Sequence, residues 1–153
     1  MQVAVCGPAR CTPAEAGYAH RVGELLADRG ATVLCGGGGG VMDAVAAGAR
    51  AAGGLVVGVL PGADRAGASR HLSVALVTNL GQARNAVLVQ SADAVIAVGG
   101  SWGTLSELAL AMRRGGVPVV CLAGWQLRDQ HGDPVPGVAL ATTPEQAVAL
   151  ALD

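Results

Sequence analysis

Two glycine-rich turns contain the residues whose types and spacing best suit ligand chemistry. The first turn is a run of glycines between an apolar segment and a helix-like segment: Gly36, Gly37, Gly38, Gly39 and Gly40. Glycine lets the backbone turn sharply and lets a ligand approach main-chain N–H groups. A helix N-terminus adds unpaired N–H donors and the positive end of the helix dipole, which together favour a phosphate. A tight turn without a ligand is the alternative, but such a turn does not need five glycines.

The second turn joins another apolar segment to another helix-like segment. It runs from Val98 through Gly99, Gly100, Ser101, Trp102, Gly103, Thr104, Leu105 and Ser106 to Glu107. The hydroxyl groups of Ser101 and Thr104 add donors to those of the backbone. Glu107 lies about one turn into the expected helix, so its carboxylate should stay near the mouth of the turn. Two structural explanations stay open for Glu107: a first-turn acid stabilised by the helix dipole, or a capping-box partner of Thr104.

A third turn follows the first apolar segment and contains Gly7 and Arg10. Gly7 would let a base or a phosphate approach the backbone, and Arg10 would pair with a phosphate. A purely structural turn is an equal alternative. This turn lacks the GxGxxG fingerprint of dinucleotide-binding enzymes. In the long glycine run, Val41 or Met42 stands where the third glycine of that fingerprint would fall.

The types of the other reactive residues exclude several kinds of chemistry. All ten cationic side chains are arginine, so no lysine can hold a phosphate as in a P-loop or form a Schiff base with pyridoxal phosphate. The histidines are scattered and the cysteines form no CxxC pair, so no metal site is expected. These residues are His20, His71, His131, Cys6, Cys11, Cys35 and Cys121. We expect reduced thiols packed near strand ends, with a metal or redox role as the alternative.

Charge and hydropathy limit the partners and the location of the protein. A net charge of −1 provides no basic field for nucleic acid. The chain starts directly with a strand-like segment, so no signal peptide is expected. No apolar run approaches the roughly 18 residues that span a bilayer. We therefore expect a cytoplasmic location, with neither a nucleic-acid nor a membrane partner.

Short apolar segments alternate with helix-like segments, which predicts βαβ units and a mostly parallel sheet. Strands are expected near residues 2–6, 31–35, 55–60, 74–78, 93–98 and 117–122, and a seventh near 137–141 is left open. Helices are expected near residues 13–29, 41–53, 81–91, 103–114 and 144–152. Thr12 and Glu15 should form a capping box at the first helix. We predict one α/β domain over residues 1–153, a Rossmann-like three-layer sandwich with a mostly parallel six- or seven-stranded sheet.

Together these motifs resemble the Lonely Guy (LOG) family and the related molybdenum-cofactor carrier proteins. The first family motif is a glycine run closed by Gly-Leu-Met, and the run closes here with Val41-Met42. The second motif is PGGxGTxxE, from which this chain departs by Val98 for the proline and by one extra residue before Gly-Thr. An Arg-Lys pair precedes that motif in LOG enzymes, and Arg84-Asn85 stands in its place. The resemblance covers roughly residues 1 to 125, and the departures look more like the carrier branch.

The resemblance implies an activity and a set of site residues. LOG enzymes cleave the N-glycosidic bond of nucleoside 5′-monophosphates and release the free base and ribose 5-phosphate. The family's catalytic arginine and glutamate would be Arg84 and Glu107. Glu107 would stabilise the positive charge that develops on the ribose, and Arg84 would hold the phosphate or orient Glu107 through a bidentate pair. The ligand- and phosphate-binding residues would be Gly7, Gly36, Gly37, Gly38, Gly39, Gly40, Met42, Gly99, Gly100, Ser101, Gly103 and Thr104.

Two functions stay open on the sequence alone. One is a nucleoside 5′-monophosphate phosphoribohydrolase, favoured by the joint presence of Arg84 and Glu107. The other is a carrier or sensor that binds molybdenum cofactor or a nucleotide without turnover, favoured by Asn85 and Val98. Both need a small phosphorylated ligand, AMP-like or molybdopterin, and no further cofactor. The absence of lysine argues against the lysine decarboxylase activity to which LOG proteins are often assigned.

The two helices near residues 81–91 and 103–114 are apolar on more than one face, beyond what one face of a sheet can cover. The family resemblance also implies a dimer that completes the sites. We therefore expect a homodimer or a larger homo-oligomer.

Overall fold

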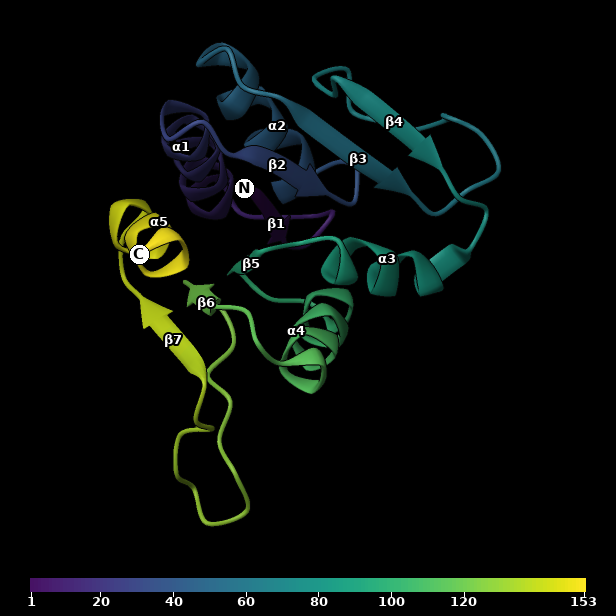
Figure 1. Cartoon of the computed structure of the whole chain (residues 1–153). Coiled ribbons are helices and arrows are strands. Elements are labelled where there is room, and N and C mark those ends of the chain that lie inside the picture. The colour runs from purple at the N-terminus through teal and green to yellow at the C-terminus, as the bar shows by residue number, and fades with distance from the viewer.

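The sheet at the centre of the molecule is parallel throughout (Figure 1). The computed structural model describes all residues, 1–153, and places seven strands in the order β4-β3-β2-β1-β5-β6-β7. The strands are β1 (Gln2–Cys6), β2 (Thr32–Cys35), β3 (Val56–Leu60), β4 (Val74–Val77), β5 (Ala94–Val98), β6 (Val119–Leu122) and β7 (Val138–Ala141). Every neighbouring pair of strands is parallel. The predicted Rossmann-like architecture is confirmed, and the seventh strand is present.

Helices cover both faces of this sheet. They are α1 (Pro13–Asp28), α2 (Val41–Ala51), α3 (Arg84–Gln90), α4 (Trp102–Arg114) and α5 (Pro144–Leu152), with a 3₁₀ turn η1 (Gly81–Ala83) before α3. Apolar side chains of α1, α2 and α5 form one buried cluster with the sheet, and those of α3 and α4 form a second cluster. The central strands are therefore buried on both faces, which explains their near-continuous apolar character. None of the helices combines the length and hydropathy that crossing a membrane requires.

Side-chain caps determine where the helices begin. Thr12 and Glu15 form the predicted capping box at α1. Helix α4 begins one residue earlier than predicted, because Ser101 Oγ accepts a hydrogen bond from the Thr104 N–H at 3.2 Å and caps the helix. The segment predicted as one helix from residue 81 is divided into η1 and α3, so Arg84 is the first residue of an α-helix.

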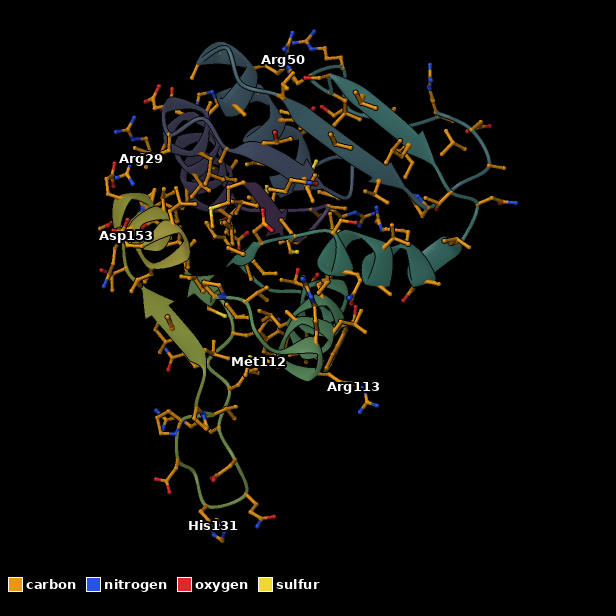
Figure 2. All side chains as sticks on the ribbon, in the orientation of Figure 1. Arg29, Arg50, Met112, Arg113, His131 and Asp153 are labelled. Carbon is orange, nitrogen blue, oxygen red and sulfur yellow. The ribbon has the colours of Figure 1, made fainter.

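The C-terminal helix lies against the N-terminal half of the chain. Helix α5 packs beside α1, and Figure 2 shows Arg29 and Asp153 near each other where these two helices end. Arg29 Nη1 lies 4.0 Å from Asp153 Oδ1. The loop between β6 and β7 instead extends away from the body (Figure 1), with His131 near its tip (Figure 2).

The strand order changes direction at β1. The chain winds outward from β1 to β4 and then returns to place β5 on the other side of β1, before it winds outward to β7. Ligands of open α/β folds bind outside the carboxyl ends of the strands at such a switch point. Gly7 directly follows β1 and Gly99 directly follows β5, so two of the predicted turns flank this position.

Candidate functional site

A cleft opens beyond the carboxyl ends of β1 and β5, where the strand order reverses. Its volume is about 170 Å³. The residues that line it are Gly7, Ala9, Met42, Arg84, Asn85, Ser101, Gly103, Thr104 and Glu107. The tertiary structure therefore brings together residues from the turn after β1, from the turn after β5 and from the starts of α2, α3 and α4. Both residues that the family resemblance marks as catalytic, Arg84 and Glu107, are among them.

The N-terminus of α4 supplies groups that suit an anion. Ser101 Oγ accepts from the Thr104 N–H and lies 2.9 Å from Thr104 Oγ1, so the two predicted hydroxyl donors are bonded to each other. The N–H groups of Trp102 and Gly103 precede the first hydrogen bonds of the helix and have no acceptor within it. A Cβ on Gly103 would meet only Ser101 Oγ, at 3.7 Å, so the space beside this backbone is open. These features together suit a phosphate.

Glu107 is a buried carboxyl group on the wall of the cleft. It is 7% exposed, and burial raises its pKa from 4.5 to about 7. The Arg84 guanidinium and a hydrogen bond from the Cys6 thiol lower the pKa, but by less than burial raises it. Helix α4 has no acid in its first turn and Ser101 caps it, so Glu107 has neither of the two structural roles left open by the sequence. A carboxyl with this pKa is partly protonated at neutral pH and can donate as well as accept hydrogen bonds.

Arg84 is held by the backbone and not by Glu107. Its Nη1 donates to the carbonyl oxygens of Gly36 and Val59, each at 2.5 Å, and its Nε donates to Asn85 Oδ1 at 2.8 Å. The two carbonyls lie at the ends of neighbouring strands, β2 and β3. No ion pair joins Arg84 to Glu107, so the bidentate pair, one of the two roles that the family resemblance implied for Arg84, is not formed. The guanidinium is nonetheless near enough to lower the pKa of Glu107.

Asn85, noticed in the sequence only as a replacement for lysine, connects α3 to α4. Its side chain is buried, and its Nδ2 donates to Ser106 Oγ at 3.1 Å while its Oδ1 accepts from Arg84. Ser106 Oγ in turn donates to the Gly103 carbonyl at 2.7 Å. The amide therefore links Arg84 to the turn at Gly103. Because Asn85 is neutral, Arg84 is the one cation among the residues that line the cleft.

Close packing accounts for most of the glycines that the sequence marks as ligand contacts. Those that do not line the cleft are Gly36, Gly37, Gly38, Gly39, Gly40, Gly99 and Gly100. A Cβ on Gly36 would meet the Met42 sulfur at 2.6 Å and Arg84 Nη1 at 2.7 Å. Gly40 has a φ of +62°, and a Cβ there would overlap the Pro8 carbonyl. The long glycine run therefore lets Arg84 and the turn after β1 approach the backbone, and a bound phosphate is not needed to explain it.

Besides Asn85, two residues of the site were not expected from the sequence as site residues. Cys6 ends β1, and burial raises the pKa of its thiol well above the usual value, with Glu107 acting in the same direction. The thiol therefore keeps its proton and serves as a donor to Glu107. Ala9 lines the cleft from the turn after β1. It carries no functional group, so no sequence pattern marks it, whereas Cys6 directly precedes the Gly7 turn and could have been found from that position.

Comparisons with known proteins show the family of the chain. The model of the SLOG cluster4 family matches residues 1–148. The molybdenum cofactor binding protein of Rippkaea orientalis superposes with a TM-score of 0.87 and 36% identity, over 97% of this chain and 93% of that one. The molybdenum cofactor carrier protein of Chlamydomonas reinhardtii superposes with a TM-score of 0.82 and 31% identity, over 97% and 93%.

A sequence relative comes from the LOG branch. A cytokinin riboside 5′-monophosphate phosphoribohydrolase of Mycobacterium tuberculosis is 37% identical over 115 residues, which are 70% of this chain and 62% of that enzyme. The matched region is therefore less than two thirds of the enzyme's length. These similarities confirm the resemblance to LOG proteins and molybdenum-cofactor carriers that the motifs predicted.

Proposed function

This chain belongs to the SLOG cluster4 family, and we propose that it binds a small phosphorylated heterocycle, a molybdopterin-type or nucleotide ligand, without cleaving it. The observation that carries this proposal is the open N-terminus of α4 in the cleft. The N–H groups of Trp102 and Gly103 are unpaired at a helix N-terminus, and Gly103 lines the same cleft as the Arg84 guanidinium. The similarity to two proteins named for binding or carrying molybdenum cofactor supports a ligand of this class.

The surroundings of Arg84 favour binding over turnover. The guanidinium is held by two backbone carbonyls and by Asn85, so it is not free to orient Glu107. Where LOG enzymes carry a second cation, Asn85 provides only a neutral amide. One cation and a helix N-terminus are sufficient to hold a phosphate, and a protein that only binds its ligand needs no more than this.

Glu107 fits a binding site because its carboxyl is partly neutral near pH 7. A protonated carboxyl does not repel a phosphate and can donate a hydrogen bond to the ligand. A bound anion would favour the protonated form further, because like charges disfavour ionisation. Binding should therefore take up a proton, and the affinity should fall as the pH rises above about 7.

The direct test is mass spectrometry of the purified protein for a bound pterin or nucleotide, followed by calorimetric titration with a pterin phosphate and with AMP. Gly103→Val should weaken binding roughly tenfold or more, because its side chain would fill the space beside the backbone N–H. Gly17→Val is the matched control, since Gly17 also has open surroundings but lies on α1. Wild-type protein that binds neither compound would contradict the proposal.

One observation favours a second function, cleavage of a nucleoside 5′-monophosphate. A carboxyl with a pKa of about 7 in a phosphate-binding cleft has the properties of a general acid–base group. In this case Glu107→Gln should reduce the release of base from AMP by roughly 10²-fold while affinity changes far less. Arg84→Ala should weaken both binding and turnover. Wild-type protein that releases no base from any common nucleoside monophosphate would exclude this function.

A further inference from the structure

A second, larger cleft adjoins the first at the N-terminus of α4. Its volume is about 370 Å³. It is lined by Pro61, Gly81, Gln82, Arg84, Asn85, Trp102 and Gly103. Three of these residues, Arg84, Asn85 and Gly103, also line the inner cleft, so the two spaces share a wall. A ligand whose phosphate lies at the α4 N-terminus can therefore extend into the outer cleft.

The outer cleft has an aromatic wall. Trp102 is 80% exposed, more than any other large apolar side chain of the molecule. Exposed apolar surface beside polar groups is typical of binding sites, because an indole in water gains free energy when a ligand covers it. The ring is not isolated: its centroid lies 5.7 Å from that of Trp125, and the two planes are tilted by 42°.

Trp125 in turn is held in place by the turn after β5. Its Nε1 donates to the Ser101 carbonyl at 3.1 Å. A Cβ on Gly100 would lie 3.0 Å from that Nε1, so the glycine at this position lets the Trp125 ring approach the backbone. This packing accounts for Gly100, which the family motif marked as a ligand contact. It also places a second ring beside Trp102.

We propose that Trp102 stacks on the planar ring of a nitrogen heterocycle whose phosphate occupies the inner cleft. The inference rests on the proposed function and specifies the second half of the ligand. Aromatic stacking is tolerant of ring identity, since every base has a π-face. Gln82 lines the same cleft, and its side-chain amide makes no hydrogen bond within the chain, so the amide offers donors and an acceptor to the edge of such a ring. Purines and pterins share this chemistry.

Calorimetric titration separates the ring from the phosphate. The probes are AMP and a pterin phosphate, which carry a ring, and ribose 5-phosphate, which does not. Trp102→Ala should weaken the binding of the ring-bearing probes roughly tenfold or more and leave the affinity for ribose 5-phosphate unchanged. Trp102→Phe should retain most of the affinity because it keeps an aromatic face. Leu150→Ala is the matched control, since Leu150 is an exposed apolar residue on α5, away from the cleft.

Fluorescence provides an independent readout, because the chain has only two tryptophans. In Trp125→Phe the single remaining indole is Trp102, and a ring-bearing probe should quench its emission, whereas ribose 5-phosphate should not. If Trp102→Ala binds AMP and the pterin phosphate as tightly as wild type while ribose 5-phosphate still binds, the stacking role is wrong and the proposed function stands. If wild type binds none of the three probes, both are wrong. The ring-bearing probe that wild type binds with the higher affinity, AMP or the pterin phosphate, shows which kind of ring the site prefers.

Discussion

Replacing Glu107 by glutamine tests whether burial keeps this carboxyl neutral near pH 7. Glutamine has nearly the same shape, stays uncharged and can still accept the hydrogen bond from Cys6. In the wild-type protein the folded chain holds a proton on Glu107 up to about pH 7, while the unfolded chain releases it near pH 4.5. Between these values the folded state binds more protons, so the stability conferred by this group is present at low pH and is lost as the pH rises.

The size of the effect follows from the two pKa values. A shift of one unit corresponds to 1.36 kcal/mol, so a rise from 4.5 to about 7 should cost the wild type about 3 kcal/mol of unfolding free energy between pH 4.5 and pH 8. Glu107→Gln removes this dependence. Its stability relative to wild type should therefore increase by about that amount across the window, which corresponds to a Tm difference of roughly 6–12 °C for a chain of this length.

Urea denaturation followed by circular dichroism, at intervals from pH 4.5 to pH 8, measures the difference. All other titrating groups are common to the two proteins and cancel when the curves are subtracted. Glu145→Gln is the matched control: Arg21 lowers the pKa of the exposed Glu145, so its titration falls below this window and the control should keep the wild-type slope. Identical pH profiles for wild type and Glu107→Gln would refute the claim that Glu107 is neutral because it is buried.

Two further predictions concern packing and assembly. Gly48→Ala should lower the unfolding free energy by about 1–3 kcal/mol in urea denaturation, because its Cβ would overlap the His20 carbonyl where α2 meets α1. Gly17→Ala, with open space around its Cβ, should instead raise the unfolding free energy by about 0.5–1 kcal/mol. Equal effects of the two substitutions would contradict this packing. Exposed apolar side chains occur on β4, in the turn after it and on α3: Val74, Leu76, Val77, Leu80 and Val87. We expect these side chains of two copies to pack against each other in a homodimer. Light scattering at micromolar concentration should then give the mass of a dimer for the wild type and for Leu150→Asp, and that of a monomer for Leu80→Asp/Val87→Asp. A monomeric wild type would contradict the expectation.

Local chemistry along the chain was sufficient to predict the elements. The alternation of apolar and helix-like segments predicts the strands, because a parallel sheet covered by helices buries both faces of its central strands. The Thr12–Glu15 capping box was predictable for the same reason: both partners lie within one turn of each other, so no other part of the chain is needed to form it. The edge of the sheet at which the cleft lies was also predictable, since the carboxyl ends of parallel strands meet at one edge, but the cleft lies at the turns after β1 and β5 and the Gly36–Gly40 run does not line it.

Only the tertiary structure decided which contacts the residues of the site make and how burial changes their pKa values. Arg84 bonds to carbonyls 48 and 25 residues away in the sequence, and these come together because β2 and β3 are neighbours in the sheet. The pKa of Glu107 depends on burial among α3, β1 and α4, which no local pattern records. Trp102 and Trp125 meet because the segment after β6 passes beside the turn after β5. Spacing along the chain determines the hydrogen bonds within a turn, whereas burial and the distance between charged groups depend on which strands are neighbours in the sheet.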